Sequence, residues 1–175
     1  MTSLDPLLRY FAAEKQGGWL LLALAVVALV VSFLIWRAGW TFRAMAPALS
    51  LVALGQFGVG AALVARTDGQ VAALTRRLET SAEAARAEEI ARIEKVQTSF
   101  RWIEIVEVVL LAAGVALALA FRTRPTWSGV GMGLVLQAAV MLVFDLVAEA
   151  RADRYLTWLR SPPAATAQAR SSEAR

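Results

Sequence analysis

The sequence of 175 residues contains no cysteine and no histidine. Without cysteine there are no disulfide bonds, thiolate metal sites or thiol nucleophiles. Without histidine the chain lacks the side chain that serves most often as a general base and as a transition-metal ligand. No glycine-rich phosphate loop or serine nucleophile motif is present. The sequence therefore predicts no enzyme activity, no metal site and no cofactor.

Charged residues are also scarce. They make up 18% of the chain, against 58% hydrophobic residues, and the mean hydropathy is +0.57. A water-soluble domain of this length has too small an interior to bury so much apolar surface. The 18 basic residues outnumber the 14 acidic ones but are scattered along the chain. This pattern fits contact with anionic membrane lipid and argues against a nucleic-acid partner. Nothing in the composition indicates a small-molecule substrate.

Four apolar stretches are long enough to cross a bilayer as helices, which takes about 20 residues each. They cover residues 18–36, 44–65, 102–121 and 127–148. Short connections join the first to the second and the third to the fourth, which predicts transmembrane hairpins at 18–66 and 102–149. We therefore expect an all-α polytopic membrane protein. Its four-transmembrane-helix bundle consists of two hairpins, with a water-exposed helical segment between spans two and three.

Three further segments flank the hairpins. Residues 1–17 predict an amphipathic helix that either lies in the headgroup layer or extends the first span into water. Residues 150–160 predict the interfacial end of the last helix. Residues 161–175 predict a disordered tail, since the last dozen residues carry no apolar side chain larger than alanine.

Residues 67–101 form the water-exposed segment, which we expect to be a helical hairpin or stalk. Asp68 is a candidate N-cap for its first helix. Residues 80–83, Thr-Ser-Ala-Glu, match a capping box and predict that a second helix begins there. The apolar positions are too few for this segment to fold alone, and its alternating Arg and Glu are typical of a solvated face.

The distribution of basic residues predicts the orientation in the membrane. More of them lie near the span ends on the side of the two termini and of residues 67–101 than on the other side. By the positive-inside rule both termini are then cytoplasmic. The two short turns, 37–43 and 122–126, contain arginine and no acidic residue, which favours the opposite orientation. The choice stays open at this stage, with the termini preferred inside.

Ionisable residues inside a span are costly and therefore informative. We call Glu104, Glu107, Asp145 and Glu149 the acidic mouth, because the two spans that carry them begin and end on the same side of the membrane. Four basic residues are expected at the same level: Arg66, Arg101, Arg151 and Arg154. The simplest interpretation is a belt of salt bridges between helix ends. A cation or proton site and a partner-binding surface are the alternatives.

Two glutamines lie near the middle of their spans. Since lipid offers no hydrogen-bond partner, Gln56 and Gln137 are expected to bond to each other between spans two and four. A polar step in a permeation path is the alternative. Small residues let helices approach closely. The glycines expected at such contacts are Gly55, Gly58, Gly60, Gly114, Gly129 and Gly133.

Two stretches carry a resemblance to a known family. They are residues 8–16, Leu-Arg-Tyr-Phe-Ala-Ala-Glu-Lys-Gln, and the run from Gly131 through Gln137 and Asp145 to Arg151. The chain resembles a family of uncharacterised four-span bacterial inner-membrane proteins. The resemblance implies the architecture and a multi-pass location in the bacterial inner membrane, and implies no activity.

Two classes of function fit these observations. The first is a protein that acts by protein–protein interaction through residues 67–101 and the acidic mouth, as a regulatory subunit, assembly factor or immunity-type protein would. The second is an oligomeric ion channel or small transporter that uses the acidic mouth and the two glutamines. Four spans are few for a monomeric pore, so the second class requires self-association.

Overall fold

The computed structural model describes residues 4–39 and 41–161. These residues form four long helices and no strand: α1 (Asp5–Ala38), α2 (Met45–Thr80), α3 (Ala82–Ala120) and α4 (Pro125–Arg160). The all-α class is therefore confirmed. Each helix is long and apolar enough to cross a membrane, judged by length and composition. The tail expected to be disordered lies outside the described residues, apart from Ser161.

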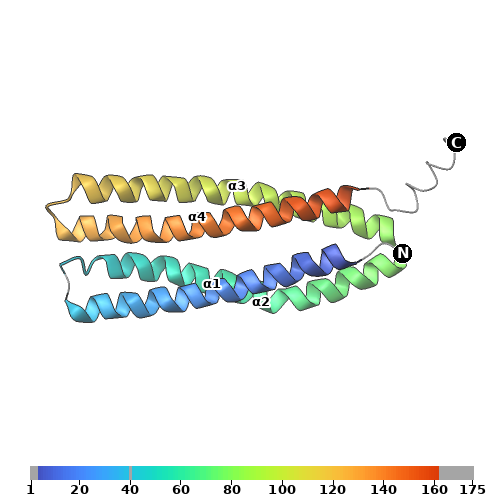
Figure 1. The fold of residues 1–175 in the computed structure, drawn as a ribbon, viewed down its shortest axis with the longest axis horizontal. Coiled ribbons are helices and arrows are strands. Elements are labelled where there is room, and N and C mark those ends of the chain that lie inside the picture. The colour runs from blue at the N-terminus through green and yellow to red at the C-terminus, as the bar shows by residue number, and fades with distance from the viewer. Residues whose placement is uncertain (1–3, 40, 162–175) are drawn as a thin grey trace.

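The helices are arranged as two long pairs, α1 beside α2 and α3 beside α4 (Figure 1). The start of α1, the junction of α2 with α3 and the end of α4 all lie at one end of the molecule (Figure 1). The pairs meet mainly through α2 and α4, with smaller contacts between α1 and α4 and between α2 and α3. Residues from the beginning, middle and end of the sequence therefore share that end.

Each pair packs closely where glycines face a neighbouring backbone. In α1 and α2, a Cβ added to Gly60 would lie 2.8 Å from the carbonyl oxygen of Gly18. In α3 and α4, a Cβ added to Gly131 would lie 2.5 Å from the carbonyl oxygen of Gly114. No side chain fits at such contacts, so glycine sets the distance between the helices.

Four of the six glycines named from the sequence lie at helix contacts within the described chain, and two do not. Gly60 and Gly114 lie at the contacts within the pairs. Gly129 and Gly133 face the backbone of residues 42–45 at the start of α2, between the pairs. Gly55 and Gly58 have open space where a Cβ would be. They share a helix with Gly60 but lie on other faces of it, because residues two and five positions away do not share a face.

The structure also bears on the two alternatives for residues 1–17 and on the helix start predicted at Asp68. Residues 5–17 are the beginning of the continuous helix α1, so they extend the first apolar stretch. Asp68 does not start a helix, since α2 runs through it and its carboxylate pairs with Lys15 of α1 at 2.7 Å. Ion pairing between neighbouring helices uses the carboxylate that was expected to act as a cap.

The boundary predicted at residues 80–83 is present, but the capping bonds are not. α2 ends at Thr80, α3 begins at Ala82, and Ser81 between them is extended, with φ −153°. The Thr80 hydroxyl donates back to carbonyl oxygens of α2, at 3.2 Å from both Arg76 and Arg77. The Thr80 hydroxyl is therefore used within α2, as threonine hydroxyls in helices often are, and does not cap α3.

The largest apolar core lies at the end where all four helices meet. We call this part the terminal bundle: residues 5–17 of α1, 67–80 of α2, 82–101 of α3 and 150–160 of α4. Its buried apolar residues are Leu7, Phe11, Leu74, Ile93, Ala152, Tyr155, Leu156 and Leu159. Residues 67–101 contribute only two of these, so their apolar face is completed by the first and last segments of the chain. Residues 67–101 are thus one half of a four-helix bundle.

Candidate functional site

The acidic mouth lies where the terminal bundle meets the apolar part of the helices. Glu107 and Asp145 are each 6% exposed, and their carboxyl groups are close enough to interact across α3 and α4. Glu104 and Glu149 interact in the same way nearer the terminal bundle. The four carboxyl groups therefore form two pairs along the α3–α4 contact. In the described part of the chain, no group of three or more acidic side chains is placed to hold a metal ion.

The expected belt of salt bridges between these carboxylates and four arginines is not present. Arg66 pairs with Glu14 of α1 at 3.0 Å. Arg151 donates to the carbonyl oxygen of Ala13 at 2.8 Å, and Arg154 donates to Ala150 in its own helix at 3.1 Å. Arg101 is exposed and acts on Glu149 only through its charge. The arginines lie at the predicted end of the apolar helices, but three of them bond to groups other than the four carboxyl groups of the acidic mouth.

The two mid-span glutamines do meet. Gln137 is 4% exposed and Gln56 is 2% exposed. The Gln137 side-chain amide Nε2 lies 3.4 Å from Gln56 Oε1 and 3.4 Å from the carbonyl oxygen of Leu49, and donates to both. This contact joins α2 to α4, as predicted. The Gln56 Nε2 group has no hydrogen-bond partner.

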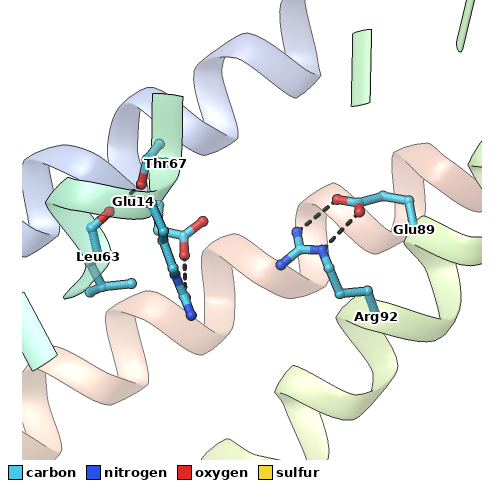
Figure 2. Close-up of polar contacts among 6 residues, drawn as sticks. Glu14, Leu63, Thr67, Glu89 and Arg92 are labelled. Atoms are coloured by element: carbon cyan, nitrogen blue, oxygen red, sulfur yellow. Dashed lines mark hydrogen bonds and ion pairs between the residues drawn. The ribbon is translucent and has the colours of Figure 1, made fainter. Parts of the chain in front are cut away.

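The terminal bundle contains a buried ion pair. Its two residues belong to the alternating Arg and Glu of residues 67–101, a pattern that is typical of a solvated face. Arg92 donates two bonds to the Glu89 carboxylate, at 2.7 and 2.8 Å, one turn apart on α3 (Figure 2). Glu89 is 6% exposed and also accepts a bond from the Tyr155 hydroxyl of α4 at 3.2 Å. The Arg92 guanidinium lies over the Phe11 ring of α1, 5.5 Å from its centroid. One ion pair therefore contacts three helices.

Aromatic stacking surrounds this ion pair. The Tyr10 and Tyr155 rings stack with centroids 4.3 Å apart and 7° between planes, and Trp158 stacks on Tyr155 at 5.7 Å. Burial raises the pKa of Tyr10 from its ordinary 10.0 to about 12, and the nearby negative charge of Glu14 adds to this. Burial and the charge of Glu89 raise the pKa of Tyr155 further in the same direction. Both hydroxyls therefore stay protonated at neutral pH.

Arg86 closes the end of the terminal bundle. Its guanidinium donates to the carbonyl oxygens of Trp158, Leu159 and Ser161, which end α4. It also lies over the Trp158 ring, 5.8 Å from the centroid. The last carbonyls of a helix lack partners within the helix and attract positive charge. A side chain of α3 thus supplies the C-terminal cap of α4.

These residues were missed because spacing along one helix does not reveal partners from distant segments. Arg86, Glu89 and Arg92 have the spacing of an ordinary charged helix face. A signal was present in the apolar residues of 1–17 and 150–160, whose faces have no partner of their own. Matching those faces to residues 67–101 would have predicted a four-helix bundle.

No protein-family model matches this sequence, and no curated protein or solved structure is significantly similar to it.

Proposed function

We propose that the chain is a multi-pass protein of the bacterial inner membrane that acts by binding another protein at its terminal bundle. The membrane location is supported by the surface of the apolar part of the helices. Large apolar side chains are widely exposed there, for example Leu51 at 74%, Leu119 at 69% and Trp19 at 58%. A surface of this kind needs lipid around it. The resemblance to four-span inner-membrane proteins supports the same compartment.

The docking proposal rests on an open groove in the terminal bundle. The groove has a volume of about 430 Å³. Its apolar lining includes Leu74, Leu78 and Trp158. Glu79 and Glu83 also line it, and so does Arg86, whose guanidinium is already bonded to carbonyl oxygens at the end of α4. An apolar groove with acidic residues beside it suits a helix that presents an apolar stripe flanked by basic residues. We therefore propose an amphipathic helix of a partner protein as its occupant.

Site-specific photo-crosslinking in native membranes tests this proposal. A photoreactive residue at Thr75, which lines the groove, should give one discrete adduct. The same residue at the neighbouring exposed position Arg76 should give none. Leu78→Arg should abolish the adduct, whereas Ala72→Arg, at a residue that lines a different groove, should leave it. An adduct unaffected by Leu78→Arg would show that the groove is not the docking site.

The orientation follows from the same proposal, since a cytoplasmic partner requires a cytoplasmic terminal bundle. The absence of cysteine from the chain makes a labelling test simple. A cysteine at Glu83 should resist a membrane-impermeant thiol reagent in intact cells, and a cysteine at Thr126 should react. Labelling at Glu83 in intact cells would reverse the orientation.

A channel or transporter is the second candidate, supported by the burial of Glu107 and Asp145 within the apolar helices. Polar groups in such positions often belong to ion or substrate paths. Four spans require self-association for this function. The oligomeric state in detergent and conductance after reconstitution separate the two candidates. A monomer or dimer without conductance would exclude the channel or transporter, and the docking proposal would be the remaining candidate.

A further inference from the structure

A second groove lies in the apolar part of the molecule, between α2, α3 and α4. Its volume is about 410 Å³, within the range of roughly 300–1,000 Å³ that small-molecule sites occupy. Its apolar lining includes Val52, Trp102, Val106 and Leu110. Trp102 and Val106 are 67% and 55% exposed, so the groove opens on the surface proposed to face lipid. A hydrophobic molecule can therefore enter from the membrane.

Two polar side chains line this apolar groove, and each has an atom without a partner. Glu107 is 6% exposed, and its Oε2 has no hydrogen-bond partner. Gln56 is 2% exposed, and its Nε2 has none either. Buried polar atoms in native proteins are nearly always bonded, because leaving one unpaired is costly. Of the two atoms, the Glu107 oxygen is an acceptor that a positively charged ligand group in the groove would satisfy.

The charged residues of the groove indicate which charge its ligand carries. Of the described residues that line it, Glu107 is the acidic one and none is basic. Asp145 interacts with Glu107 from α4 and adds a second carboxyl group behind it. An anionic lipid headgroup would be repelled by these carboxylates. A bare divalent cation needs six or more oxygen ligands, and no group of three acidic side chains is placed to hold one among the residues described.

We propose that this groove binds a lipophilic organic cation. The cationic centre lies against Glu107, and its apolar rings or chains lie against Val106 and Leu110. Trp102 at the edge of the groove adds an aromatic face that attracts positive charge. This site is separate from the groove of the terminal bundle, so either proposal can fail without the other.

Binding to the purified full-length protein in detergent tests the proposal, measured by equilibrium dialysis. The probe is tetraphenylphosphonium, a cation enclosed by four apolar rings. Tetraphenylborate has the same shape and the opposite charge, and it serves as the control ligand. Saturable binding of tetraphenylphosphonium, at least about tenfold tighter than that of tetraphenylborate, is expected because the Glu107 carboxylate attracts the cation and repels the anion. Equal binding of the two ions, or no saturable binding of the cation, would overturn the proposal.

Two pairs of variants locate the site. Glu107→Gln should weaken tetraphenylphosphonium binding at least about tenfold, because it removes the charge and keeps the size of the side chain. Glu94→Gln, at an exposed residue of the terminal bundle that pairs with Arg160, should leave binding unchanged. Val106→Trp fills the groove without altering a charge and should also abolish binding. Val143→Trp, on an equally exposed face of α4 that belongs to a different groove, should not.

Circular dichroism and size-exclusion chromatography show which variants fold. If Glu107→Gln does not fold, the comparison of Val106→Trp with Val143→Trp decides the location. Binding that survives Val106→Trp, or that is lost equally in Val143→Trp, would place the cation elsewhere and overturn the proposal.

Discussion

Breaking the buried ion pair of the terminal bundle should destabilise this part of the molecule strongly. In Arg92→Met, the Glu89 carboxylate loses two bonds of 2.7 and 2.8 Å and keeps only that from Tyr155 at 3.2 Å. Removing one partner of a buried pair costs about 3–5 kcal/mol. Since the Arg92 side chain is 30% exposed, the lower end applies, and we expect a loss of about 3 kcal/mol.

Removing both charges should restore most of the stability. The double variant Glu89→Leu, Arg92→Met has no unpaired charge, and apolar side chains replace both groups. Such exchanges are often close to neutral, and the lost acceptor of Tyr155 costs about 1 kcal/mol. The double variant should therefore be about 2 kcal/mol more stable than Arg92→Met alone.

Thiol labelling measures this effect directly, since the chain contains no native cysteine. Ala85→Cys places a thiol at a buried position one turn from Glu89. A loss of about 3 kcal/mol should raise the labelling rate roughly a hundredfold in Arg92→Met. Arg76→Met, at an exposed residue bonded only within its own helix, serves as control and should change the rate little. The argument fails if the double variant is labelled as fast as Arg92→Met.

Three further predictions concern helix contacts, capping and pH. Gly131→Ala should lower the unfolding free energy in detergent by about 1–3 kcal/mol, because a Cβ there would lie 2.5 Å from a carbonyl oxygen. Gly58→Ala, in open space, should stabilise α2 by up to about 1 kcal/mol in the same thermal scan, and equal effects at both sites would contradict the packing argument. Arg86→Met should cost about 1–2 kcal/mol and speed hydrogen exchange only at the end of α4; uniform exchange along α4 would show that Arg86 is not a cap. Because burial raises the pKa of Tyr10 from 10.0 to about 12, the unfolded chain loses that proton first as pH rises. The contribution of Tyr10 to stability should be constant below pH 10 and be lost between pH 10 and 12, so stability should fall less steeply over this range in Tyr10→Phe. A fall of the same size in both proteins would exclude Tyr10.

The sequence was sufficient to predict the features that depend on local composition and periodicity. Four apolar stretches of about 20 residues predict four long helices, because each must satisfy its own backbone hydrogen bonds in lipid. The contact between Gln56 and Gln137 was also predictable. An amide near the middle of an apolar stretch has few partners other than a similar amide at the same depth.

Features that depend on which faces meet were less predictable. The sequence does not show that Arg66 faces Glu14 and that Arg151 faces Ala13. The prediction of a salt-bridge belt at the acidic mouth was therefore wrong. Both contacts join residues that are far apart in the sequence, by 52 and 138 positions. For the same reason, the sequence does not show that Glu89 is buried. Its burial depends on Tyr155 of α4 and on Phe11 of α1, which lies beneath Arg92.

Polar and aromatic contacts help to determine how the two helix pairs fit together, beside the close contacts of Gly129 and Gly133 and the apolar core of the terminal bundle. Within each pair, glycines bring backbones together and leave little freedom. Between the pairs, apolar packing alone discriminates weakly, because lipid solvates apolar side chains as well as another helix does. The contacts that join the pairs in the described chain include the amides of Gln56 and Gln137, the bond from Arg151 to Ala13 and the stacking of Tyr10 on Tyr155. Each of these needs a defined geometry, so a shift of one pair along the other by a turn would break all three at once. The arrangement of the pairs is therefore specified by few residues, and these occur both in the terminal bundle and in the middle of the apolar helices.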